Sequence, residues 1–441
     1  MDLMPAQEIA MPVLDNTVQA VLGQPMSIGA FHQAVEQLSP KRLRKVLSRV
    51  VPLNDQDDAG VTALMRAVRS GNVDKIRLLL ACGADPELTD HLDRTALDWA
   101  VSRDFIPGIE LLLNYGVDRG YHPKYPRRPM DADLPVFEPG PEAWGEEMLP
   151  QTIGRALLDI SIRKLAAQED PFRPIPAIGM VRSLAALQLF LDEGDPLTDA
   201  PLFARCKYLG LEANGEIHCS RDEYLESGAR VFGKTNGEVI KNPFYTDMVH
   251  SAASATTARF HFESWLEDCL PEGTPIWSND RVGISLTRLA NGNWVQIGGQ
   301  YDDAPEYDYC VYNDVIEYDG RGEFTIYGYP KDVFPPTDHH SATLINDHLY
   351  VIGGLGDFID DDLQQTNVYR WNIQSKQFEQ VVTQGQSPQQ LFKHTASYDP
   401  HRQAIIISGG KRHTDVSKPA ECNEELFVLD LRNNTWSEVK V

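Results

Sequence analysis

Apolar residues follow two different repeats, one in the first third of the chain and one in the last third. Between residues 60 and 118 the pattern returns after 33 residues. Gly60-Val61-Thr62-Ala63-Leu64 returns as Asp93-Arg94-Thr95-Ala96-Leu97, Leu78-Leu79-Leu80 as Leu111-Leu112-Leu113, and Gly83-Ala84-Asp85 as Gly116-Val117-Asp118. From residue 275 onward, strand-like runs end in Gly298-Gly299, Gly353-Gly354 and Gly409-Gly410. One unit of such a repeat cannot bury its own apolar face, so both patterns predict stacked repeats.

The first pattern predicts two helices in each unit. In the segment from Asp58 to Asp90, Thr62 can cap a helix that carries Leu64, Ala67 and Val68 on one face. The pair Gly71-Asn72 breaks this helix, and Val73 to Ala81 forms a second one. Gly83 supplies the positive φ that ends the second helix.

These residues resemble the ankyrin repeat, whose pattern is G-x-T-P-L-H-x-A, then a leucine triplet, then G-A-D. A weaker copy at Phe31-His32-x-Ala34-Val35 fits an atypical N-terminal cap. The resemblance implies an all-α solenoid whose turn tips and first helices form a concave, protein-binding surface. The matching positions here are Met65, Arg66, Arg69, Asp98, Trp99 and Ser102. Trp99 beside an arginine is typical of an interface; alternatively, it packs under the segment that follows.

The middle of the chain is less regular. Residues 121–150 are rich in proline, glycine and acid, which favours a linker or an irregular wrap. Ile153 to Gln168 and Met180 to Asp192 have helical periodicity and are either further degenerate repeats or helices that join the two halves. Asn214-Gly215 predicts a hairpin turn, and Asn242-Pro243 opens a helix that runs toward Phe260.

Residues Gly228 to Thr235 fit the phosphate-loop pattern G-x-x-x-x-G-K-[ST]. Such a loop needs a buried strand before it and a helix after it, so that backbone N–H groups point at phosphate. The preceding residues are acidic and polar, and Asn236-Gly237 would stop a helix. We therefore interpret this match as accidental and expect no cofactor.

The C-terminal pattern predicts four strands per unit, as in the blades of a β-propeller. The motifs are similar to the kelch family: H-[ST]-A at His340 and His394, a run ending in Gly-Gly, N-[DE]-x-aromatic, and a closing aromatic. The resemblance implies buried, hydrogen-bonded roles for His340 and His394. Three such units are too few to close a ring. Either degenerate strands supply the remaining blades, or the array is open, or a partner completes it.

The segments after each Gly-Gly differ in charge. Because they are equivalent loops, they would lie together at one end of a propeller. Two are acidic with interleaved aromatics and one is basic, which suggests a protein interface. The candidate binding residues are Tyr301, Asp302, Asp303, Glu306, Tyr307, Asp357, Asp360, Asp361, Lys411 and Arg412. Calcium binding by Asp360 to Asp362 is a weaker alternative, because the run lacks the spacing of a calcium loop. We assign neither a metal site nor a catalytic residue.

Composition narrows the choice of partner. The 441 residues include 40 basic and 64 acidic ones, a net charge of −24 that repels nucleic acid and anionic membranes and suits a basic protein. Six scattered cysteines give neither a zinc pattern nor a disulfide framework. The N-terminus does not read as a signal peptide, and we expect a cytoplasmic protein.

These observations predict a multidomain protein, with an N-terminal all-α ankyrin solenoid and a C-terminal all-β kelch-like propeller that is incomplete or irregular. The expected divisions are an extension (1–25), ankyrin repeats (26–120), a proline-rich linker with helices (121–200), a mixed connecting region (201–274) and propeller blades (275–441). The leading hypothesis is a non-enzymatic scaffold or inhibitor. The alternatives are a bacterial immunity-type protein that neutralises a toxin, and a propeller enzyme of carbohydrate-active or oxidase-like type.

Overall fold

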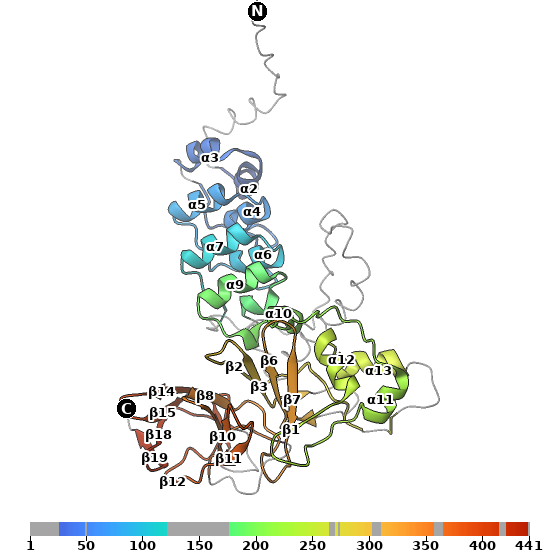
Figure 1. Cartoon of the computed structure of the whole chain (residues 1–441). Coiled ribbons are helices and arrows are strands. Elements are labelled where there is room, and N and C mark those ends of the chain that lie inside the picture. The colour runs from blue at the N-terminus through green and yellow to red at the C-terminus, as the bar shows by residue number, and fades with distance from the viewer. Residues whose placement is uncertain are drawn as a thin grey trace, which may run out of the picture. The chain divides into compact units, whose positions relative to one another are not determined.

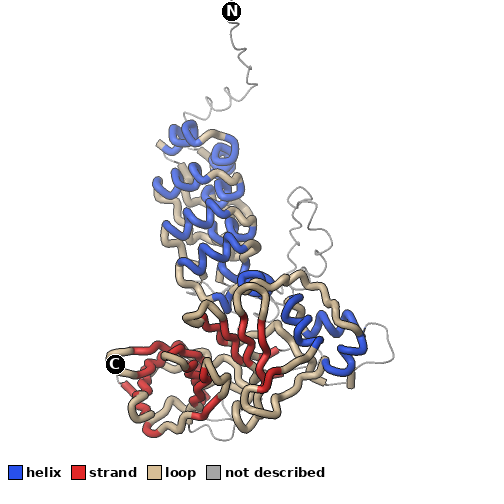
Figure 2. The backbone as a smooth tube through the Cα atoms, in the orientation of Figure 1, coloured by secondary structure: helices blue, strands red, loops and turns tan. Residues whose placement is uncertain are grey.

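The computed structural model describes residues 26–48, 51–120, 176–263, 270–271, 274–301, 310–356, 365–413 and 420–439. These residues divide into two compact units, which meet in the sequence between Asp195 and Pro196. The first unit is built from helices, and strands dominate the C-terminal part of the second (Figures 1 and 2). No helix in the described part of the chain is long and apolar enough to cross a membrane.

The first unit consists of helical pairs stacked in two layers. The first helices are α2 (Ile28–Gln37), α4 (Ala63–Arg69) and α6 (Ala96–Ser102), and the second helices are α3 (Pro40–Leu47), α5 (Val73–Ala81) and α7 (Ile106–Asn114). Within each layer, successive helices contact one another (Figure 1). Thr62 and Thr95 accept backbone N–H groups at the starts of α4 and α6, as the sequence predicts for Thr62.

Residues 176–195 add a further repeat to this stack. The short helix η4 (Ala177–Met180) contacts α6, and α9 (Leu184–Asp192) contacts α7. The second helices α5, α7 and α9 end in the same way, with Gly83, Gly116 and Gly194 at positive φ. Of the two alternatives for Met180 to Asp192, the further repeat is therefore correct. The helix expected at Ile153 to Gln168 lies outside the described residues.

The hairpin expected at Asn214-Gly215 is wrong. The N–H groups of Ala213 and Gly215 donate to the carbonyls of His250 and Ser251, so the turn bonds to a helix end instead of joining two strands. The helix expected from Asn242-Pro243 to Phe260 is interrupted. It forms α12 (Pro243–Ser251) and α13 (Ala255–Glu263), separated at Ala252 by a left-handed conformation that ends α12.

The phosphate-loop match and the residue after it run along the outer edges of two sheets. A helix, α11 (Arg221–Ser227), precedes it, and the two-residue strand β1 (Glu238–Val239) follows it. The Asn236 side chain bonds the backbone N–H and C=O of Phe378 at 2.9 Å each. A Cβ at Gly233 would lie 2.2 Å from the backbone of Gly328, so glycine is needed there for close packing. This arrangement is not the strand–loop–helix that cradles phosphate.

Three larger sheets form the blades of the second unit. The first has the order β1-β7-β6-β3-β2, the second β11-β10-β9-β8, and the third β12-β19-β18-β15-β14. Their remaining strands are β2 (Ser285–Arg288), β3 (Trp294–Ile297), β6 (Val315–Tyr318), β7 (Phe324–Gly328), β8 (Ser341–Ile345), β9 (His348–Ile352), β10 (Val368–Asn372), β11 (Phe378–Gln380), β12 (Gln384–Gly385), β14 (Thr395–Asp399), β15 (Ala404–Ser408), β18 (Leu426–Asp430) and β19 (Thr435–Val439). Two small sheets pair β4 (Gln300–Tyr301) with β5 (Cys310–Val311), and β16 (Lys411–His413) with β13 (Gln390–Phe392) and β17 (Glu421–Cys422).

The blades pack face to face in chain order. Strand β8 contacts both β2 and β14, and separate apolar clusters fill the spaces on the two sides of the second blade. Helices cover the other face of the first blade: Tyr208 of α10 (Leu202–Tyr208) packs on Trp294, and His250 of α12 packs on Phe324. Within the described residues, the strands do not close a ring.

The same two contacts join each blade to the next. The Nε2 atoms of His340 and His394 lie 2.9 and 2.8 Å from the hydroxyls of Ser285 and Ser341 on the preceding blade. Both histidines are buried, as the kelch resemblance implies. A Cβ at Gly353 would lie 2.2 Å from the carbonyl oxygen of Leu391, which leads into the next blade.

A buried ion pair holds the chain that enters the first blade. The Arg281 guanidinium makes two bonds to Asp314, one of them 3.0 Å long, and also donates to backbone carbonyls. The indole of Trp277 donates to the same carboxylate at 2.7 Å. Every charge in this cluster is therefore compensated, as burial requires.

We expect Arg281→Leu to lower the free energy of unfolding of the second unit by about 3–5 kcal/mol, because it leaves the Asp314 carboxylate buried and uncompensated. Arg370→Leu is the matched control. Arg370 pairs with Glu379 in an exposed position, and its loss should cost at most about 1 kcal/mol. Urea unfolding followed by tryptophan fluorescence measures both, and equal losses would contradict the proposed importance of the buried pair.

Stability should also fall in mild acid because of the blade histidines. Burial lowers the pKa of His340 to about 3 and that of His394 to about 4, whereas an unfolded histidine titrates near 6.5. Their contribution is thus complete above pH ~6.5 and is lost as the pH falls toward these folded-state values. Each histidine should cost about 1.4 kcal/mol per pH unit in that range. His340→Gln should reduce this slope between pH 6.5 and 5, and an unchanged slope in urea titrations would refute it.

Candidate protein-interaction site

An ion network crosses the first helices of the helical unit. The Arg66 guanidinium donates to Glu36 at 3.1 Å and to Asp57 at 2.6 Å, and Arg69 also donates to Glu36. Glu36 lies on α2, whereas both arginines lie on α4. The network thereby fixes two arginines, with the Arg69 side chain still 44% exposed.

Burial favours the neutral form of Asp57, but hydrogen bonds from Arg66 and from the amides of Val61 and Ala59 outweigh it and lower the pKa of this carboxyl. His32 lies 3.6 Å from Asp57. Burial lowers the pKa of His32 despite that carboxylate, so the ring is neutral near pH 7. The cluster therefore carries the charges of two arginines and two carboxylates.

Asp90 repeats the role of Asp57 one unit later. Each carboxylate accepts the amides two and four residues ahead of it and the side chain nine residues ahead. For Asp90 that side chain is Trp99, whose indole N–H donates at 2.9 Å. Arg94 bonds the same carboxylate and lies over the Trp99 ring at 4.9 Å. Trp99 is therefore half-buried and held in place, with an arginine against its face.

The prediction of six surface residues is wrong for two of them. Met65 is fully buried, and its sulfur lies 3.5 Å from the Thr62 amide. Asp98 is 3% exposed because its carboxylate accepts the amide of Thr95 and completes the cap of α6. Both lie at the third position of a short helix, where the side chain turns back to the cap. Arg66, Arg69, Trp99 and Ser102 remain at least partly exposed.

The residues expected in the propeller loops are only partly described. Asp302, Asp303, Glu306, Tyr307, Asp357, Asp360 and Asp361 lie outside the described residues. Tyr301 is buried in β4 and contacts Thr256 through its hydroxyl, so it is not a loop contact residue. Lys411 and Arg412 belong to strand β16 instead of a loop. Arg412 is half-buried and pairs with Glu425 at 2.9 Å, because β16 is fixed between β13 and β17.

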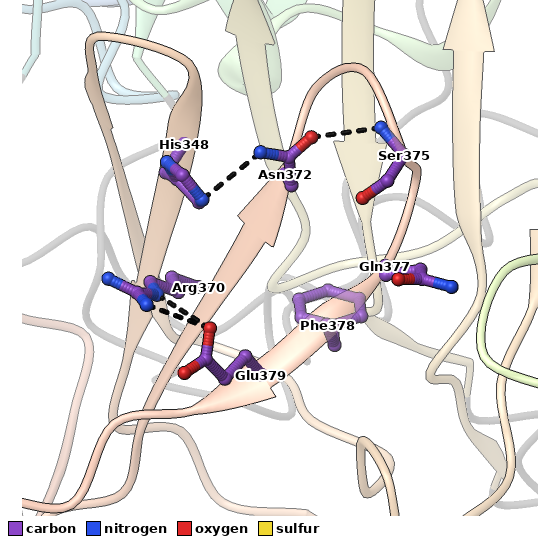
Figure 3. A pocket seen from close by; sticks show the side chains of 7 residues that line it. All are labelled: His348, Arg370, Asn372, Ser375, Gln377, Phe378 and Glu379. Atoms are coloured by element: carbon purple, nitrogen blue, oxygen red, sulfur yellow. Dashed lines mark hydrogen bonds and ion pairs between the residues drawn. The ribbon is translucent and has the colours of Figure 1, made fainter.

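One polar hollow of about 210 Å³ lies on the second blade. Figure 3 shows its lining residues: His348, Arg370, Asn372, Ser375, Gln377, Phe378 and Glu379. Arg370 and Glu379 bond each other, and Asn372 bonds His348 and the Ser375 amide (Figure 3). Because these groups satisfy one another, the hollow gives little reason to expect a ligand. No motif in the sequence marks this hollow, because it is the strand register that brings Arg370 opposite Glu379.

Other reactive groups are buried for structural reasons. Burial raises the pKa of the Cys206 thiol to about 12, which makes it a poor nucleophile. Within the described ranges, no group of three or more His, Cys, Asp and Glu residues could hold a metal ion. What the described residues bring together is a surface of fixed charges and one aromatic ring.

The geometry defines a repeat protein with two kinds of repeat, helical pairs and blades of four or five strands. Comparison with family models agrees with this division. Residues 31–120 match ankyrin repeats in three copies, and residues 283–441 match the KLHDC2/KLHL20/DRC7 Kelch-repeats domain. The chain thus combines ankyrin repeats with a Kelch-repeat domain, and repeats of these families indicate a protein-interaction scaffold.

Two further proteins show similarity to parts of the chain. An ankyrin repeat-containing protein of Treponema pallidum (strain Nichols) is 32% identical over 106 residues, which are 24% of this chain and 36% of that protein. A chain in the structure of a predatory endopeptidase from Bdellovibrio bacteriovorus in complex with an immunity protein is 28% identical, with a TM-score of 0.20. That match covers 22% of this chain and 50% of the other, and carries no argument about function. The chain thus spans half or less of either relative.

We expect Asp90→Ala to open the turn before α6, because four donors lose their shared acceptor. The change should destabilise the helical unit by about 2–3 kcal/mol. Hydrogen exchange of the Leu92 and Arg94 amides should accelerate accordingly. Asp74→Ala, which removes an exposed partner of Arg77, is the control and should leave that exchange unchanged.

Proposed function

We propose that this protein is a non-enzymatic scaffold that binds another protein through the first-helix face of its ankyrin repeats. The contact surface consists of Arg66, Arg69, Arg94, Trp99 and Ser102. The single observation that carries the proposal is the repeated network in which Asp57 and Asp90 fix an arginine and a tryptophan at equivalent positions of consecutive repeats.

Such fixed side chains suit binding. Tryptophan and arginine are the residue types that carry most binding energy at interfaces, and a side chain that is already ordered loses less entropy on association. Arg69, although bonded to Glu36, keeps 44% of its side chain exposed and can therefore contact a partner. Polar Ser102 bonds the carbonyl of Trp99 and supports the same face.

The charge of the partner and the more specific roles remain predictions. A basic partner, held by the acidic segments after the Gly-Gly pairs, depends on residues outside the described ranges. The inhibitor and immunity-type roles have no further support from the similar proteins. A propeller enzyme is less favoured because His340 and His394, the motif histidines of the blades, have structural roles.

The test is affinity purification with quantitative mass spectrometry, followed by measurement of the dissociation constant with the purified partner. Trp99→Ala and Arg69→Ala should each weaken binding about thirtyfold, the effect of losing a 2 kcal/mol interface residue.

Arg77→Ala is the matched control, since Arg77 lies exposed on the second-helix layer. It should leave the affinity unchanged. If the partner binds Trp99→Ala and Arg69→Ala as tightly as the original protein, the proposed face is wrong. If those two variants and Arg77→Ala all lose binding equally, the effect is one of folding.

A further inference from the structure

The helix α3 concentrates exposed positive charge on a protein that is acidic overall. Its exposed side chains include Lys41, Arg42, Arg44 and Lys45, whereas Leu43 and Val46 are buried on the side that contacts α5. Across the described ranges, none of the four cations forms an ion pair. This makes α3 unlike α4, whose arginines are held by Glu36 and Asp57.

The charges of α3 work against the helix that carries them. Lys41 and Arg42 lie in its first turn, where the helix dipole is positive and acidic residues are preferred. No acidic residue lies in that turn, and the side chain of Ser39 makes no capping bond. Lys41 also faces Arg44 and Lys45 at spacings where like charges repel. Arg44 and Lys45, in the last turn, are favourable to the dipole, so helix stability accounts for two of the four cations only.

Solubility does not account for the other two. The chain already carries 64 acidic residues, and each added cation brings its net charge closer to zero. An anionic partner would offset both unfavourable interactions. Its negative charges would lie near the positive end of the helix dipole and between the cations that repel one another.

We propose that the exposed face of α3 binds an acidic segment of another protein. Eight residues of helix are about 12 Å long, enough for a short run of carboxylates. Nucleic acid extends much further and would meet the acidic remainder of the chain, and α3 offers no aromatic ring for a base to stack on. This surface goes beyond the first-helix face of the proposed function, and its test does not depend on that face.

The experiment measures binding of a fluorescein-labelled octaglutamate peptide to the full chain in 0.15 M salt, where long-range repulsion is screened. The double variant Lys41→Gln/Arg42→Gln should weaken binding about fivefold or more, and neutralising all four cations should abolish it. Arg77→Gln/Arg103→Gln is the matched control, because it removes the same charge from α5 and from the exposed residue after α6. It should bind the peptide like the original protein.

Thermal unfolding separates binding from folding. Lys41→Gln/Arg42→Gln should unfold at the same or a higher temperature, because it removes unfavourable charges. Absence of octaglutamate binding to the original protein, or an equal loss in the control variant, would overturn the proposal. Tighter binding of a single-stranded oligonucleotide with the same number of charges would also overturn it, in favour of nucleic acid.

Discussion

The structure depends on one constraint: no repeat buries its apolar face unless the next repeat covers it. Each repeat therefore has contacts that position the repeat that follows it. In the helical unit, the carboxylates of Asp57 and Asp90 fix consecutive turns, and glycines at positive φ end the second helices. In the blades, a histidine bonds the serine of the preceding blade, and a glycine leaves room for the chain that follows. These contacts recur because neighbouring units present the same geometry.

The first and third blades differ from the second at the faces where the described residues place no neighbouring blade. Helices α10 and α12 cover the outer face of the first blade, and position 284, where the later blades have histidine, is Ile284. On the third blade, Gly409 has no neighbour among the described residues where a Cβ would lie, unlike Gly353. Thr395, at the position of Ser285 and Ser341, is exposed. The third blade thus leaves open the space that a further blade would fill. It also has a more polar residue at an equivalent position, Ser408 in place of Ile352.

Repeat positions could be predicted from the sequence because they depend on local spacing. The offset of 33 residues located the helices, and the histidine and glycine motifs located the blade contacts. Side-chain exposure was harder: Met65 and Asp98 fold back onto their own helix caps, which a surface position in the repeat does not reveal. The hairpin prediction at Asn214-Gly215 was wrong because the segment bonds to the end of α12, which is distant in the sequence. The network around Asp57 and Asp90 was missed, although their spacing equals the repeat and could have marked them.

The helical unit presents positive charge in two physically different forms. On the first-helix face, carboxylates hold the arginines in one geometry, so their ordering entropy is lost when the protein folds and not when a partner binds. Such groups contribute to affinity and to the choice of partner. On α3 the cations have no such partners among the described residues, and they keep their rotamer freedom until an anion arrives. Each charge of that kind adds less to affinity than an ordered one, because ordering a long side chain offsets much of the Coulomb gain, but together they also speed association. The two proposed surfaces would thus have different roles: α3 would attract a partner, and the first-helix face would discriminate among partners.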